Sequence, residues 1–139
     1  MSQATAILLN WDAYPNFTED EFRCKCGCGR ADMQPEFLNF VQLLRTACGF
    51  PFVITSGFRC EKHDSSIGGA GVHPSGQACD LNVYGVQALA ILDLRKRFGF
   101  NRIGLKQTGR FNSRFVHIDT LTKNADGDDI PSPWVWTYK

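Results

Sequence analysis

The sequence predicts one α+β domain with a largely antiparallel sheet and flanking helices. Helical patterns come first in the chain, and strand patterns follow them, interleaved with one further helix and ending in a hairpin. The chain has 139 residues, of which 43% are hydrophobic and 12% aromatic, a size and composition that fit a single core. We therefore expect a single domain over residues 1–139, with its core at about 17–120 and a C-terminal aromatic tail at 121–139.

Two helices are predicted in the first half of the chain. Thr18 and Glu21 in "NFTEDEF" have the spacing of a capping box, which predicts a short helix. Pro35 begins a longer helical pattern that Gly49 ends. Its apolar positions fall on one stripe, as expected for a helix packed on the core: Phe37, Phe40, Val41, Leu44 and Cys48.

Strands are predicted in the middle and the second half of the chain. "PFVITSG" (51–57) is a run rich in β-formers, and "ACDLNV" (78–83) alternates apolar and polar residues. A helix is predicted over 85–99. "RIGL" (102–105) and "RFVHIDTL" (114–121) then predict the two strands of a hairpin.

The tail after the hairpin combines turn residues with aromatic ones. Trp134, Trp136 and Tyr138 follow "KNADGDDIPSP". Aromatic side chains can form the flat wall of a substrate cleft, but large apolar residues more often pack on a core. We expect the tail to pack on the core.

Charge and hydropathy indicate where the protein is made and what it does not bind. The 15 basic and 14 acidic side chains nearly cancel, so neither nucleic acid nor an anionic membrane is an expected partner. No stretch has the roughly 18 apolar residues of a membrane span, and "MSQATAILLNW" lacks the features of a signal peptide. We expect a monomer that is synthesised in the cytoplasm.

The six cysteines admit several interpretations. A reducing cytoplasm favours free thiols or a metal site over disulfides. In "CKCGCG", side chains of an extended chain alternate between two sides, so Cys24 and Cys28 could share a face. This spacing differs from the C-x₂-C of an ordinary zinc knuckle. Buried thiols, a structural metal, and a disulfide to Cys48 or Cys60 all remain open.

Three residues form a candidate metal-ligand set. His73 and Asp80 lie in the glycine-rich run "GAGVHPSGQACDL", and His117 lies in "FVHID". Two nitrogens and one oxygen are a donor set that catalytic zinc takes, with water in the fourth position. The glycines would let the loop fold back and bring His73 to Asp80. The H-x₆-D spacing alone also fits ordinary polar residues of a loop.

Three motifs in one order resemble the M15 family of zinc peptidases, which includes D-alanyl-D-alanine carboxypeptidases and phage endolysins. The motifs are "TSGFRCEKHD", "GGAGVHPSGQACDL" and "RFVHID", preceded by the similar opening "NFTEDEFRCKCGCG". The resemblance covers about residues 17–120. It implies a Hedgehog/DD-peptidase-like fold, a Zn²⁺ ion held by His73, Asp80 and His117, and Arg59 as the residue that holds a substrate carboxylate or carbonyl.

The sequence departs from this family at the catalytic base. Many M15 enzymes place an acidic residue three positions before the last zinc histidine, where this chain has Arg114. Asp119 projects from the same face of its strand as His117, so we expect it to be either the base or an acceptor that orients a ligand ring. Arg59 has the planar fork that grips a carboxylate. We place Ser56 at the substrate site, where it braces either the end of the strand or the turn that carries Arg59 rather than acting as a nucleophile.

The resemblance implies a zinc peptidase that hydrolyses the stem peptides of bacterial peptidoglycan. The compact chain resembles a phage or prophage endolysin, which acts at the bacterial cell wall after release through a holin-type pore. Two reactions remain open, an L-Ala-D-Glu endopeptidase and a D-Ala-D-Ala carboxypeptidase. The missing acidic residue keeps a second function open, a non-catalytic peptidoglycan-binding or phage structural module on the same fold. A thiol-based metal or redox protein is a third interpretation.

Overall fold

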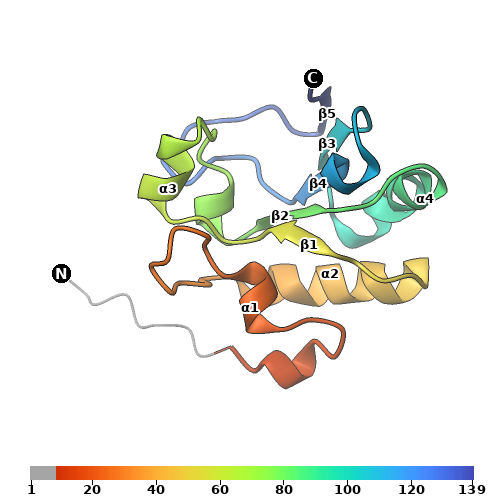
Figure 1. The fold of residues 1–139 in the computed structure, drawn as a ribbon, viewed down its shortest axis with the longest axis horizontal. Helices are drawn as coiled ribbons and strands as arrows, with labels where there is room; N and C mark the ends of the chain where they lie inside the picture. The colour runs from red at the N-terminus through yellow and green to blue at the C-terminus, as the bar shows by residue number, and fades with distance from the viewer. Residues whose placement is uncertain (1–8) are drawn as a thin grey trace.

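Five strands form one mixed sheet in the computed structural model, which describes residues 9–139 (Figure 1). The sequence predicts no signal peptide in the N-terminal run "MSQATAILLNW". Most of this run falls in residues 1–8, which lie outside the described residues. The strand order is β1-β2-β4-β3-β5, and every pairing is antiparallel except the parallel pairing of β3 with β5. The strands are β1 (Ile54–Ser56), β2 (Ala78–Leu81), β3 (Arg102–Lys106), β4 (Phe115–Asp119) and β5 (Trp134–Thr137). The predicted α+β class is confirmed.

Four α-helices accompany the sheet within the described part of the chain, and the two expected in the first half are both present. The Glu21 carboxylate accepts a hydrogen bond of 2.7 Å from the Thr18 N–H at the start of the short helix Glu19–Phe22. The second expected helix begins at Pro35 and ends where Gly49 adopts a left-handed conformation. The helices are α1 (Glu19–Phe22), α2 (Pro35–Cys48), α3 (Glu61–Ser66) and α4 (Val86–Leu94). No helix within residues 9–139 combines the length and the apolar character needed to cross a membrane.

The sheet has one apolar face and one polar face. Helix α2 runs along the apolar face (Figure 1), where its buried side chains share the main core with alternate residues of β2 and β4. Cys79 and Ile118 point into this core, so Asp80 and His117 point to the opposite face. The core residues contributed by α2 and these two strands are Phe37, Leu38, Val41, Leu44, Cys79, Leu81, Val116 and Ile118.

The polar face is covered by two loops that lie far apart in the sequence. The segment between β4 and β5 passes over this face beside α3 (Figure 1), and it contacts the glycine-rich loop 67–76. The Ala125 N–H donates to the Gly71 carbonyl over 2.7 Å. A small second core of Val72, Ala78 and Leu121, with Ile130 against it, joins the two loops.

The structure differs from the sequence prediction in two elements. Helix α3 was not predicted, and the tail expected to pack on the core forms β5, an edge strand of the sheet. The predicted helix 85–99 continues after α4 as a tighter 3₁₀ turn, Arg95–Phe98, before Gly99 ends it. The hairpin of β3 and β4 is confirmed, with Gly104 opposite His117.

Candidate metal centre

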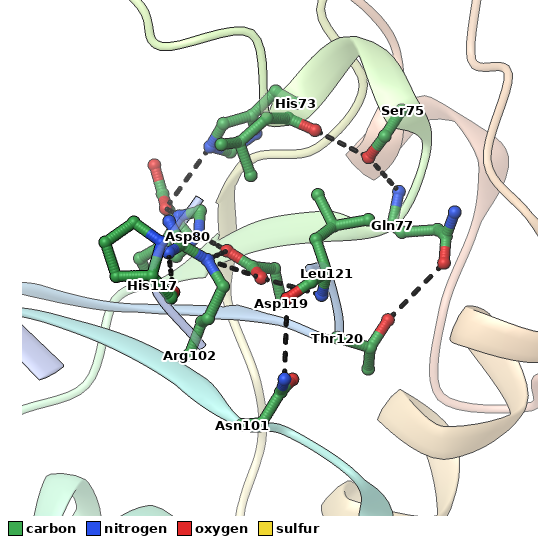
Figure 2. Close-up of polar contacts among 12 residues, drawn as sticks. His73, Ser75, Gln77, Asp80, Asn101, Arg102, His117, Asp119, Thr120 and Leu121 are labelled. Carbon is green, nitrogen blue, oxygen red and sulfur yellow. Dashed lines mark hydrogen bonds and ion pairs between the residues drawn. The ribbon is translucent and has the colours of Figure 1, made fainter. Parts of the chain in front are cut away.

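The three predicted ligands converge on the polar face of the sheet (Figure 2). Asp80 on β2 and His117 on β4 are direct partners in the antiparallel register, and His73 begins a 3₁₀ turn at the end of the glycine-rich loop. The Asp80 Oδ1 atom lies 2.9 Å from Nδ1 of His117 and 3.6 Å from Nε2 of His73. All three residues are buried, and one donor atom from each lies within 4.8 Å of the others.

Each histidine ring is oriented by a hydrogen bond from its other nitrogen. Nδ1 of His73 donates to the Gly57 carbonyl over 2.7 Å, which leaves the lone pair of Nε2 free to bind a metal. Nε2 of His117 contacts Oδ2 of Asp119 at 2.7 Å, which leaves Nδ1 as the free nitrogen. Partners of this kind fix the tautomer of metal-binding histidines. The donor set and its orientation fit a zinc ion.

The charge of Asp80 suits a cation. Burial opposes ionisation of Asp80, but hydrogen bonds from His117 and His73 outweigh it and hold the pKa of Asp80 well below its ordinary value. Burial likewise lowers the pKa of His117, yet its hydrogen bonds to Asp119 and Asp80 raise that pKa overall. Asp80 therefore remains a carboxylate, the form that a metal ligand requires.

Asp119 lies behind His117 and has no exposed surface. Its Oδ1 atom accepts from the Leu121 N–H at 3.0 Å and lies 3.0 Å from Nε of Arg102. Its other oxygen contacts the His117 ring. Since both carboxylate oxygens are engaged with protein groups, this geometry favours the second of the two roles left open for Asp119, the acceptor that orients the ring. Arg102, which completes this chain of contacts, was not recognised in the sequence.

Arg59 reaches the site from the loop after β1. Its guanidinium lies 3.0 Å from Asp64 and 3.5 Å from the Asp80 oxygen that faces away from the histidines, and its Nε donates to the Ser56 hydroxyl over 3.0 Å. Arg59 lines the cavity described below, whereas Ser56 is not among the lining residues. Ser56 thus braces Arg59, as expected, without lying at the cavity itself.

The glycine-rich loop is shaped by the buried carboxylate of Asp64. This carboxylate accepts a hydrogen bond of 2.9 Å from the Gly71 N–H while it pairs with Arg59. A Cβ atom at Gly69 would lie 2.1 Å from Oδ1 of Asp64, so only glycine leaves room for the carboxylate there. At Gly76, φ is +72° and a Cβ would lie 2.3 Å from the Asp32 carbonyl. These contacts confirm that the glycines let the loop fold back onto Asp80.

Replacement of Gly69 by alanine should therefore destabilise the protein. The backbone there has no positive φ, so the cost arises from the clash with Asp64 and should lower the free energy of unfolding by about 1–3 kcal/mol. Urea unfolding measures this change. The exposed Ser65→Ala on α3 is the matched control, and a Gly69→Ala protein as stable as this control would show that the loop accommodates the methyl group.

A cavity of about 500 Å³ opens over the three ligands. Its floor contains His73, Asp80 and His117, and Arg59 lies on its wall. Apolar and aromatic side chains complete the lining, which is typical of a site that binds an organic ligand. They include Val72, Phe115, Ile130, Trp134, Trp136 and Tyr138.

The C-terminal tail supplies much of this aromatic wall. Trp136 on β5 lies over Gly104, where an added Cβ would come within 2.7 Å of the indole. The centres of the Trp136 and His117 rings are 5.1 Å apart, and the Arg102 guanidinium stacks on the indole at 4.8 Å. Our expectation that the tail packs on the core was thus incorrect, because the pairing of β5 with β3 turns these side chains toward the metal centre.

Comparison with known proteins gives one family. A model of the family described as Peptidase M15 matches residues 15–119, a range that contains the three candidate ligands. The curated proteins that we compared include none that matches this chain. The family match covers more than half of the chain, and M15 peptidases are zinc enzymes, in agreement with the donor set found here. The chain belongs to the M15 family of peptidases.

Proposed function

We propose that the protein is a zinc peptidase that hydrolyses the stem peptides of bacterial peptidoglycan and serves as an endolysin. The observation that carries the proposal is the set of two oriented imidazole nitrogens and one carboxylate oxygen on the floor of an aromatic cavity. Zinc bound to such a set supplies an activated water and polarises the scissile carbonyl. M15 membership supports the peptidase activity.

The residues around the ligands would bind and orient the peptide. Arg59 has two of its guanidinium nitrogens paired with Asp64 and Asp80, and its remaining N–H groups are available to a substrate carboxylate or carbonyl. The aromatic wall of Trp136 and Tyr138 offers a flat apolar surface for the rest of the ligand. The pair of Asp119 with Arg102 holds the His117 ring in place from behind.

The nature of the bond is tested by product analysis. The purified protein is incubated with zinc and sacculi, and the soluble products are identified by mass spectrometry. Release of free D-alanine would identify a carboxypeptidase, and cleavage between L-Ala and D-Glu would identify the endopeptidase expected of an endolysin. If zinc-loaded protein leaves both bonds intact, the proposed hydrolysis is wrong.

One observation favours a second candidate function, a module that binds peptidoglycan without cleaving it. Among the described residues that line the cavity, Asp80 is the only carboxylate, and it is itself a ligand of the centre. A general base in the usual position is therefore missing. Co-sedimentation of the zinc-loaded protein with sacculi that remain uncut would support this module, whereas release of peptide fragments would exclude it.

Substitution of Arg59 by lysine tests the substrate contact. Lysine keeps the positive charge beside Asp64 and Asp80 but loses the planar fork that grips a carboxylate. We expect kcat/KM to fall about tenfold, mainly through KM, with the zinc content unchanged. Steady-state kinetics on a soluble stem peptide measures the effect. Lys62→Arg on the exposed side of α3 is a control, and unchanged kinetics in Arg59→Lys would remove Arg59 from the substrate site.

A further inference from the structure

A second cluster of ligand-type side chains lies outside the cavity, at the junction of the N-terminal segment with α3. It consists of Cys24, Cys26, Cys28 and Cys60, whose sulfur atoms all lie within 4.8 Å of one another. Cys24 and Cys60 are buried, whereas Cys26 and Cys28 are exposed. Apolar packing in the core explains why Cys24 and Cys60 are buried. It does not explain why the exposed side chains of Cys26 and Cys28 point toward these two sulfurs.

A tight turn builds this cluster from the run "CKCGCG". Gly27 and Gly29 have φ values of +90° and +79°, which other residues rarely adopt. The Cys24 N–H closes the turn with a 2.7 Å hydrogen bond to the Arg30 carbonyl. Our expectation of an extended run is wrong here, because the two glycines bend the backbone into a turn that gathers the three sulfurs close to one another.

Backbone N–H groups surround the sulfur atoms. The Cys28 N–H points at the sulfur of Cys26 over 3.4 Å, and the Cys60 N–H points at the sulfur of Cys24 over 3.3 Å. At the start of α3, the His63 N–H donates to the sulfur of Cys60 over 3.4 Å. Such hydrogen bonds favour the thiolate form, which is the form that binds metal.

The distances fit a tetrahedral metal site and do not fit disulfides. Zinc binds thiolate at about 2.3 Å, so the sulfurs of a tetrahedral Cys₄ site lie about 3.8 Å apart. Here the sulfur of Cys26 lies 3.5 Å from that of Cys24 and 3.6 Å from that of Cys60. A disulfide needs a separation of about 2.05 Å. We infer that Cys24, Cys26, Cys28 and Cys60 form a second, structural zinc site in this protein.

This site would fasten the N-terminal segment to the part of the chain that carries Arg59. Cys60 directly follows Arg59 and begins α3, which also contains Asp64. Four sulfur ligands complete the tetrahedral coordination of a zinc ion and leave no open position for water or substrate. The role of this ion is therefore structural rather than catalytic. A metal here joins chain positions 24–28 and 60, and it holds the base of the Arg59 loop beneath the cavity.

Metal analysis of the full chain tests the inference independently of peptidase activity. By plasma mass spectrometry we expect about two zinc ions per chain in the unmodified protein and about one in the Cys26→Ser, Cys28→Ser double variant. His73→Ala should also retain about one zinc, because it removes only the ion of the cavity. Combining the three substitutions should leave none. Cys48→Ser, at a half-buried thiol away from the cluster, is the matched control and should keep both ions.

Failure of this inference is distinct from failure of the proposed function. If His73→Ala removes all zinc, the cysteines hold none and the inference is overturned even if the enzyme is active. Iron instead of zinc would also overturn the assignment. A cobalt-loaded His73→Ala protein gives a further test, since thiolate ligands produce an ultraviolet charge-transfer band and its absence would exclude sulfur coordination.

Alkylation of the unmodified protein tests the same site even if the cysteine variant does not fold. Cys26 and Cys28 are exposed, so free thiols there would react rapidly with iodoacetamide. Peptide mapping is expected to show them protected in the native protein and alkylated after a strong chelator is added, with the half-buried Cys48 as the internal reference. Rapid alkylation of Cys26 and Cys28 without loss of zinc would overturn the inference.

Discussion

Replacement of His73 by alanine is expected to abolish peptidase activity together with the metal of the cavity. The variant leaves only Asp80 and His117 to hold the ion, and a site with two protein ligands cannot retain zinc at neutral pH against water. A zinc ion contributes several kcal/mol to stabilisation of the transition state. We therefore expect kcat/KM to fall about 1000-fold or more.

Kinetics on a stem peptide and metal analysis of the same preparation check this result. His63→Ala is the matched control, because His63 lies on α3 and is not part of the centre; it should keep both the metal and the activity. Thermal unfolding shows whether His73→Ala remains folded after it loses its 2.7 Å hydrogen bond to the Gly57 carbonyl. A folded His73→Ala protein with full activity would refute the assignment of the metal centre.

Most of the fold could be predicted because local patterns encode it. The capping box at Thr18, the apolar stripe after Pro35 and the strand alternation around Asp80 each specify an element and its buried face. The edge strand β5 could not be predicted in the same way. Its parallel pairing with β3 spans a long connection, and aromatic residues at such spacing fit either an exposed tail or a strand.

The candidate ligands and Asp119 were predicted, but the other groups that support the two rings were not. The chain has only three histidines, and the resemblance places two of them, His73 and His117, with Asp80 in one ligand set. The Gly57 carbonyl accepts from His73 across 16 residues of chain, and Arg102 contacts Asp119, the partner of His117, across 17 residues. A backbone carbonyl has no sequence signature, and an arginine on a strand is usually exposed. Only the folded arrangement shows that the Gly57 carbonyl orients the His73 ring and that Arg102 holds Asp119 against the His117 ring.

The cysteine cluster could not be predicted from the local spacing of its residues. An extended conformation was expected for "CKCGCG", whereas two left-handed glycines fold it into a turn. The fourth member, Cys60, lies more than 30 residues further along the chain and reaches the cluster only because the segment after β1 packs against α1. There the Phe58 N–H donates to the Phe22 carbonyl over 2.9 Å. A four-sulfur arrangement therefore requires the tertiary structure.

Substitution of Asp119 by asparagine is expected to weaken zinc binding about 10–100-fold, the effect of losing a group that orients a metal ligand. Asparagine has nearly the same shape but no negative charge, so it holds the His117 ring less firmly in the tautomer whose Nδ1 faces the metal. It also leaves Arg102 buried without its carboxylate partner, which should lower the free energy of unfolding by about 3–5 kcal/mol. Zinc titration of the apoprotein with a competing chelator measures the affinity.

The same variant separates the two roles that the sequence leaves open for Asp119. A positioning residue acts through the metal, so most of kcat should return when zinc is saturating. A general base acts on the reaction itself, so its loss lowers kcat about 10²–10⁴-fold at any zinc concentration. Asp93→Asn, at an exposed carboxylate on α4, is the matched control. The buried position of Asp119, with both oxygens bound to protein groups, predicts recovery with zinc; a folded, zinc-saturated variant that stays inactive would instead make Asp119 the base.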